Sequence, residues 1–195
     1  MLRDPARSHP PALAGGRVHE AEGPARRGFA LVQAARHRGQ VIWVLPAHVA
    51  QLPMLRGLPE GLGERLHLLR PAGEADLLWA VEECLRSPGV GLVIAEPEKP
   101  LSLLAGRRLQ LAAEAGATTG LMLVREGQGS NAAETRWHCA PLPSEEGDST
   151  PQHWELKKNK KGTTGFWTVH RNGATAAFNL VSASRERDGA AETPR

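Results

Sequence analysis

Two glycines near the start of the chain have the spacing of a nucleotide-binding loop. Gly23 and Gly28 keep the G-x-x-x-x-G frame of a P-loop. In such a loop backbone N–H groups surround phosphate, a lysine reaches the β- and γ-phosphates, and a hydroxyl binds Mg²⁺. Here Phe29 and Ala30 stand where the lysine and the hydroxyl residue belong. A phenyl ring carries no charge and a methyl group has no oxygen, so this degenerate P-loop predicts a nucleotide-binding scaffold without the chemistry of an NTPase.

The segments around the glycines have the order that a P-loop requires. Residues 17–21 form a plausible short strand, residues 29–37 carry apolar residues at helical spacing, and residues 41–45 are a second, fully apolar strand. Strand, glycine loop, helix and strand follow one another in this motif. Taken alone, the pattern also fits an ordinary turn between a strand and a helix, in which glycine only eases the bend.

The rest of the chain first alternates strands with helices and then continues as strands alone. Before residue 126 we expect further strands at 66–71, 90–96 and 119–125 and a helix at 74–86. A second helix is expected to begin at Pro100 and to be capped by Gly116. Its inward residues are expected to be Leu101, Leu104, Ala105, Leu109 and Ala112. The strands expected after it are 135–142, 154–158, 166–170 and 177–181, with a polar loop from 141 to 151. This order predicts an α/β fold: a parallel sheet with helices on both faces and an antiparallel C-terminal extension.

Length and composition indicate one cytoplasmic domain. The chain has 195 residues, 41% of them hydrophobic and 23% charged, with a net charge of +3. We expect a single domain over residues 17–183, a flexible segment at 1–16 and a disordered tail at 184–195. No apolar run approaches the roughly 20 residues that span a bilayer, and no secretion signal is evident. The two cysteines lie far apart in apolar segments, which is typical of buried free thiols in a reducing compartment.

Other side chains that could do chemistry have unsuitable spacing. The eight histidines show no metal-binding pattern. His138 and Cys139 are neighbours on an expected strand, so their side chains point to opposite faces and cannot form a nucleophile–base pair. Trp137, Trp154 and Trp167 are expected to pack in the core; an exposed one would be a candidate interface anchor.

The order of elements over residues 17–170 resembles the RecA core. The segments that carry this resemblance are Arg17–Ala30 with its glycine loop, Leu45-Pro46-Ala47-His48, the helix and strand from Glu74 to Glu96, Gly129-Ser130-Asn131-Ala132-Ala133, and Lys157-Lys158-Asn159-Lys160. The resemblance implies a RecA-like P-loop NTPase fold.

More closely, the chain resembles the ImuA family, short RecA-like proteins of bacterial mutagenic repair. The phrases that carry this likeness are Arg17-Val18-His19-Glu20-Ala21, Gly28-Phe29-Ala30-Leu31, Arg107–Glu114, Thr135-Arg136-Trp137 with Ala140–Pro143, and a pattern from Trp154 to Val169. The resemblance implies a cytoplasmic accessory factor induced by DNA damage in the SOS response and acting in translesion synthesis. Its implied partners are an ImuB-like protein without polymerase activity, an error-prone DNA polymerase III α-type subunit and, as a further partner, RecA.

The resemblance to RecA also assigns the groups of the hydrolytic site. RecA's catalytic glutamate, which orients the attacking water, corresponds to Ala47, and its Walker-B acid corresponds to Glu96, whose side chain is one methylene longer. Phosphoryl transfer depends on positioning and charge neutralisation, and three of the four groups that provide them are missing. We therefore expect no ATPase activity, no cofactor and no metal site, with Glu96 either in a structural role or as a strand-end carboxylate that faces solvent.

Four lysines around Asn159, here called the basic turn, are Lys157, Lys158, Lys160 and Lys161. In RecA filaments two lysines of the matching segment reach the neighbouring subunit's ATP. By resemblance, Lys158 and Lys160 belong to a face that docks on RecA; a merely solvated turn is the alternative.

Binding to DNA is expected to be weak or indirect. Arg107 and Arg108 join the basic turn as candidate contacts, but strong sequence-independent binding needs several phosphate contacts. Three functions remain open at this stage: a non-catalytic adaptor in translesion synthesis, a regulator resembling SOS cell-division inhibitors, and a residual ATP-binding RecA-like protein.

Overall fold

One sheet runs through the described chain, and the order of its strands decides where the glycine loop lies. The structure is a computed structural model that describes residues 10–53, 58–144, 149–172 and 178–184. Its strands are β1 Val18–Glu22, β2 Gln40–Val44, β3 Leu66–Leu69, β4 Val90–Ala95, β5 Thr119–Leu123, β6 Thr135–Pro141, β7 Ser149–Asn159, β8 Gly165–Asn172 and β9 Phe178–Ser184. Its helices are α1 Arg26–Arg36, α2 Glu74–Arg86 and α3 Leu103–Gly116. Within these residues, no helix combines the length and apolarity needed to cross a bilayer.

The sheet has a parallel part and an antiparallel part, as predicted. Its strand order is β3-β2-β4-β5-β1-β6-β7-β8-β9. All neighbours from β3 to β6 are parallel, whereas β6 with β7, β7 with β8 and β8 with β9 are antiparallel. Strand β6 was expected to open the antiparallel extension, but it lies parallel to β1. The boundary between the two parts therefore falls after β6, beside the central strand that leads into the glycine loop.

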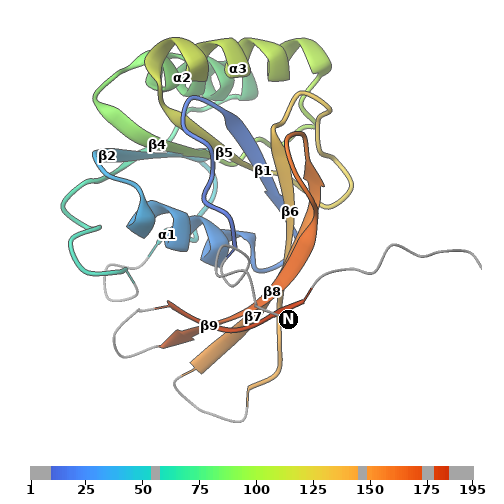
Figure 1. The fold of residues 1–195 in the computed structure, drawn as a ribbon. Coiled ribbons are helices and arrows are strands. Elements are labelled where there is room, and N and C mark those ends of the chain that lie inside the picture. The colour runs from blue at the N-terminus through green and yellow to red at the C-terminus, as the bar shows by residue number, and fades with distance from the viewer. Residues whose placement is uncertain (1–9, 54–57, 145–148, 173–177, 185–195) are drawn as a thin grey trace, which may run out of the picture.

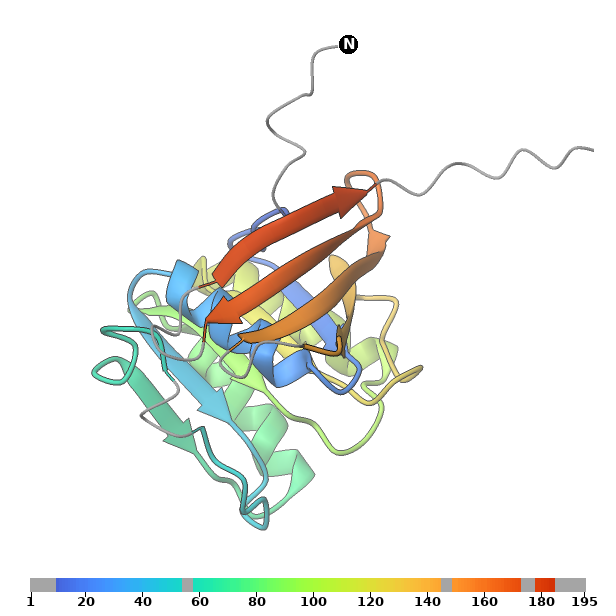
Figure 2. The ribbon, with the colours of Figure 1, turned by 90° about the horizontal axis from the view of Figure 1, so that it is seen from below.

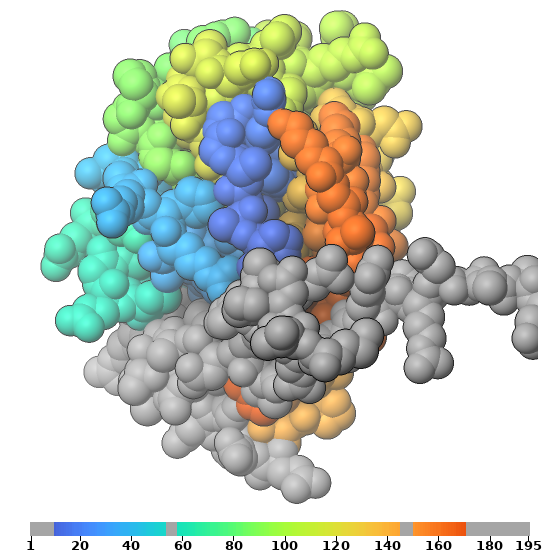
Figure 3. Space-filling model, in the orientation of Figure 1, coloured from blue at the N-terminus to red at the C-terminus, as the bar shows by residue number. Residues whose placement is uncertain are grey.

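Helices cover both faces of the parallel part, which confirms the mixed α/β expectation (Figure 1). Successive residues of a strand point to opposite faces. In β2, Val41 and Trp43 belong to the core under α1, while Val44 belongs to the core under α2 and α3. The space-filling view shows α2 and α3 as one continuous outer layer on their side of the molecule (Figure 3).

The antiparallel strands curl over the face that carries α1 (Figure 2). Trp137, Trp154 and Trp167 on β6, β7 and β8 are 1%, 0% and 8% exposed, so the prediction that all three pack in the core is confirmed. Strand β7 is longer than predicted and begins at Ser149. Pro151 lies near its start, beyond the last pair of the β6–β7 ladder, and its carbonyl oxygen accepts the N–H of Leu142 at 2.9 Å.

Both ends of α3 differ from the prediction. The helix begins after Ser102 rather than at Pro100, because the Ser102 hydroxyl accepts the N–H of Ala105 at 3.1 Å and caps it. At the other end, Ala117 adopts the left-handed conformation (φ 53°) that was expected of a capping glycine. Gly116 is instead the last helical residue, and a Cβ there would meet the carbonyl oxygen of Leu85 at 2.1 Å. Its role is to let α2 and α3 approach closely.

The inward face of α3 is also narrower than predicted. Leu109 and Ala112 are buried as expected, but Leu104 is 71% exposed. The buried side is formed by Gly106, Leu109, Ala112, Ala113 and Gly116. Leu104 lies outside it because successive helical residues are rotated by about 100°.

The expected chain ends are described only in part. Residues 1–9 and 185–195, which make up most of the segments predicted to be flexible or disordered, lie outside the described residues. Residues 10–16 are described, and among them Leu13 is 5% exposed and packs in the core under α1.

Strand β1 buries a histidine whose protonation is linked to folding. The His19 ring contacts the Thr135 hydroxyl through Nδ1 at 2.7 Å and the Ala14 carbonyl oxygen through Nε2 at 3.1 Å. Burial lowers the pKa of His19 from 6.5 to about 4. The folded chain therefore binds this proton only at a pH well below that at which the unfolded chain binds it.

This linkage predicts acid sensitivity from one residue. As the pH falls from about 6.5 to about 4, the unfolded state gains a proton on His19 that the folded state lacks, so the free energy of unfolding should fall by roughly 3 kcal/mol over this window. Urea unfolding of the wild type and His19→Gln at several pH values measures this. The variant should show a smaller fall; equal falls in both proteins contradict the assignment.

Candidate functional site

The loop between β1 and α1 is held by strand β6 through its backbone. Gly23 has φ +89°, and a Cβ on it would meet the carbonyl oxygen of Cys139 at 2.5 Å. The same carbonyl oxygen accepts the N–H of Ala25 at 3.0 Å. Gly23 is therefore required both for its conformation and for this close approach. The N–H of Ala25, one of the loop groups that would bind phosphate in a working P-loop, therefore donates to a carbonyl oxygen of β6 instead.

Helix α1 begins at Arg26, three residues earlier than predicted, so the second glycine is helical. A Cβ on Gly28 would meet the side-chain amide of Gln152 on β7 at 2.5 Å. Gly28 therefore lets α1 lie against the antiparallel strands.

Phe29 occupies the lysine position and points into the core. Its side chain is fully buried, as is that of Ala30. The ring centroid lies 5.1 Å from that of Trp137 and 4.8 Å from that of Trp154, the latter edge to face. A lysine placed there would put an ammonium group between two indoles in the interior, with the desolvation cost of a buried charge. The position serves packing between α1 and strands β6 and β7.

Glu96, at the Walker-B position, is bound by an arginine from the glycine loop. Arg27 donates from Nε to both carboxylate oxygens, at 2.9 and 3.1 Å, and from Nη2 to Oε2 at 2.8 Å. The indole N–H of Trp43 adds a hydrogen bond of 2.9 Å to Oε1. The carboxylate side chain is 12% exposed. A carboxylate that accepts an arginine fork and an indole N–H has most of its acceptor capacity in use.

The two arginines of the loop also bind backbone carbonyl oxygens of the protein. Arg27 also donates to the carbonyl oxygen of Gln51 at 2.9 Å. Arg26 donates to the carbonyl oxygen of Gly23 at 3.0 Å. Both guanidinium groups therefore satisfy protein acceptors at the start of α1.

Ala47 lies just beyond β2, at the same edge of the sheet as Glu96 and the glycine loop. Its carbonyl oxygen accepts a hydrogen bond from Arg70, and its side chain is a methyl group. Ligands of open α/β sheets bind at this carboxyl edge of the strands. The structure thus gathers Gly23, Arg27, Ala47 and Glu96 into one place, and the charged members of that group bind each other.

Lys158 and Lys160 of the basic turn lie toward the opposite edge of the sheet, beside the start of β6. Lys158 donates from Nζ to the carbonyl oxygen of Asn131 at 2.9 Å, and Lys160 donates to that of Ala132 at 2.7 Å. Burial, followed by the charges of Lys160 and Arg136, lowers the pKa of Lys158. These two cations are thus held on neutral acceptors, so the two positive charges remain close together.

The other two lysines of the basic turn pair with carboxylates. Lys157 lies 2.8 Å from Glu22, and Lys161 lies 3.9 Å from Glu134. The hydrogen bond from Lys157 to Glu22 raises the pKa of this lysine. Arg107 and Arg108 are exposed on α3, and the adjacent Gly106 packs against Ser130 and Ala132 of the loop that accepts the hydrogen bonds of Lys158 and Lys160.

A buried carboxylate that the sequence analysis missed supports the loop before β6. Glu20 is 1% exposed and accepts the N–H of Ser130 at 2.7 Å and the Nε–H of Arg136 at 2.9 Å. Burial raises the pKa of Glu20 despite these donors. An acidic residue inside an otherwise buried strand was the available signal. Across the described parts of the chain, no group of three His, Cys, Asp or Glu side chains is placed to hold a metal ion.

Truncating Phe29 tests its packing role. Phe29→Ala should lower the free energy of unfolding by about 3–5 kcal/mol, because it removes a ring from a fully buried aromatic cluster. Phe166→Ala is the matched control, since this ring is only partly buried and lies beside the His153 ring, with centroids 5.4 Å apart. Urea denaturation compares the two variants; similar small losses in both contradict the assignment.

Comparison with known proteins identifies the family. No family model matches the sequence. Two curated proteins named Protein ImuA, from Caulobacter vibrioides strains NA1000 / CB15N and ATCC 19089 / CIP 103742 / CB 15, are each 34% identical to this chain over alignments that cover 80% of it and 71% of each relative. Identity at this level over most of both proteins shows common descent, and the chain belongs to the ImuA family.

Proposed function

We propose that this chain is a non-catalytic, RecA-like accessory protein of error-prone translesion DNA synthesis, acting by protein contacts in a cytoplasmic ImuA/ImuB system. Family membership supports the process. The observation that carries the non-catalytic role is the Arg27–Glu96 pair, whose three hydrogen bonds lie at the edge of the sheet where a P-loop protein holds phosphate and Mg²⁺.

Several features support descent from a RecA-like nucleotide-binding fold. The glycine loop follows a central parallel strand and leads into a helix, as in P-loop proteins. Glu96 directly follows β4 at the same edge of the sheet. Phe29 and Ala30 are core residues, so the scaffold has kept its packing while the phosphate-binding groups are absent. Binding of an ImuB-like protein and of a DNA polymerase III α-type subunit is the proposed use of this scaffold.

The process itself is testable in the source bacterium. Deletion of the gene should reduce mutation after DNA damage, and the wild-type chain supplied in trans should restore it. The double variant Arg27→Gln with Glu96→Gln removes both charges of the pair. Because no nucleotide step is involved, it should restore mutation in proportion to the amount of folded protein. Unchanged damage-induced mutation in the deletion strain, together with altered cell division, favours the division regulator instead.

Docking on RecA is the proposed role of Lys158 and Lys160. Their adjacent ammonium groups donate hydrogen bonds to the carbonyl oxygens of Asn131 and Ala132. Each ammonium group has further N–H donors for an anionic partner. Lys158→Glu with Lys160→Glu should weaken binding to RecA filaments by at least about tenfold. Lys161→Glu, at a side chain 70% exposed, changes the net charge by the same two units as either reversal alone and is the control for the single variants Lys158→Glu and Lys160→Glu.

Surface-bound RecA filaments at several salt concentrations provide the readout for this test. Equal binding by the wild type and the double variant at every salt concentration rules out docking through these lysines. A matching loss of single-stranded DNA binding by the purified double variant assigns them to nucleic acid instead.

A further inference from the structure

Helix α3 has a regular, exposed face that does not include Lys158 and Lys160, the lysines proposed to dock on RecA. Leu104, Arg107, Arg108 and Leu111 follow the i, i+3, i+4, i+7 spacing and therefore share one side of the helix. Leu104 and Leu111 are 71% and 66% exposed. Two large apolar side chains at this spacing have the arrangement of a helix-binding surface, in which anchors recur once per turn or two.

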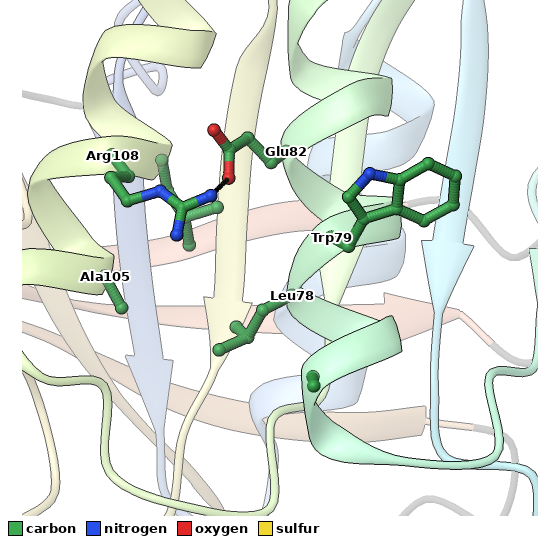
Figure 4. Close-up of a pocket in the computed structure, with 7 residues that line it drawn as sticks. Leu78, Trp79, Glu82, Ala105 and Arg108 are labelled. Carbon is green, nitrogen blue, oxygen red and sulfur yellow. Dashed lines mark hydrogen bonds and ion pairs between the residues drawn. The ribbon is translucent and has the colours of Figure 1, made fainter.

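A groove between α2 and α3 adjoins this face. Its cavity of about 270 Å³ is lined by Ala75, Leu78, Trp79, Glu82, Ala105, Arg108 and Leu109. In the close-up, Leu78 and Ala105 face the space between the helices, while the Trp79 ring projects from α2 away from α3 (Figure 4). Pockets for small ligands usually measure about 300–1,000 Å³. This groove is smaller and mostly apolar, which suits one or two side chains of a protein partner.

Charge defines the chemistry of that partner. Glu82, 7% exposed, is bound by Arg86 and by Arg108, so its negative charge is offset within the protein. Figure 4 shows the contact with Arg108, at 2.5 Å. Between Leu104 and Leu111 the sequence has two arginines and no carboxylate. The exposed face of α3 is therefore apolar at its ends and cationic in the middle.

We propose that the α3 face and the adjoining groove, together the α2–α3 surface, bind an acidic amphipathic helix of a protein partner. Apolar side chains of that helix cover Leu104 and Leu111 and enter the groove, and its carboxylates pair with Arg107 and with the exposed donors of Arg108 that Glu82 does not use. A nucleic-acid strand fits less well, because it would place phosphates against two exposed leucines. This inference rests on the proposed adaptor role only in requiring a protein partner.

A designed peptide tests the surface directly. The probe is a fluorescently labelled helical peptide with leucines on one face and flanking glutamates, titrated against the full chain while anisotropy is recorded. Leu104→Glu with Leu111→Glu should weaken binding by at least about tenfold. Arg107→Glu should weaken it less and reduce its dependence on salt. Leu142→Glu, at a leucine 37% exposed beyond β6, should bind as the wild type does.

Three results overturn the proposal. They are the absence of peptide binding to the wild type, equal binding by the wild type and the double leucine variant, and tighter binding of single-stranded DNA than of the peptide with dependence on Arg107. A peptide with the same composition in scrambled order must fail to bind, and circular dichroism confirms that each variant is folded. This test uses only purified components, so its result is independent of the gene-deletion experiment: either one can fail while the other succeeds.

Discussion

The contact of the Phe29 ring with the indoles of Trp137 and Trp154 is the interaction on which the rest of the structure depends. It joins α1 to β6, the last parallel strand, and to β7, the first antiparallel one. Trp167 on β8 extends the cluster, with its ring centroid 5.5 Å from that of Trp137. An aromatic core of this kind requires an apolar residue at position 29, so packing and phosphate binding make opposite demands on the same side chain.

The apolar residue at position 29 also determines which charges pair at the glycine loop. Without a lysine at position 29, a carboxylate at the end of β4 needs another cation, and Arg27 supplies it with a bidentate geometry that a single ammonium group cannot offer. The Trp43 indole and the Gln51 carbonyl complete the arrangement. The edge of the sheet that holds phosphate in P-loop proteins is thereby stabilised by the chain's own side chains.

Much of this could be read from the sequence, because apolar runs and helical spacing report burial directly. The strands of the parallel part, helix α2 and the packing of the three core tryptophans were all expected. The parallel pairing of β6 with β1, the partners of Arg27 and the exposure of Leu104 were not, since each depends on which segments meet in space. Gly116 is instructive: its position at a helix end suggested a left-handed cap, whereas the close approach of Leu85 explains it. Leu104, which was predicted to face inward, and Leu111, to which no role was given, became informative only once their exposure and the neighbouring groove were known.

Around the glycine loop, Arg27 and Glu96 bind each other and the N–H of Ala25 donates to Cys139, so groups that a nucleotide and its metal would use are bound within the protein. Isothermal titration of the purified wild-type chain with ATP and Mg²⁺ tests this most directly. The account predicts no saturable heat of binding, because Arg27 and Glu96 bind each other and no lysine stands at position 29. Saturable binding with a micromolar Kd would contradict it, and loss of that binding in Arg27→Gln would place the nucleotide at this loop.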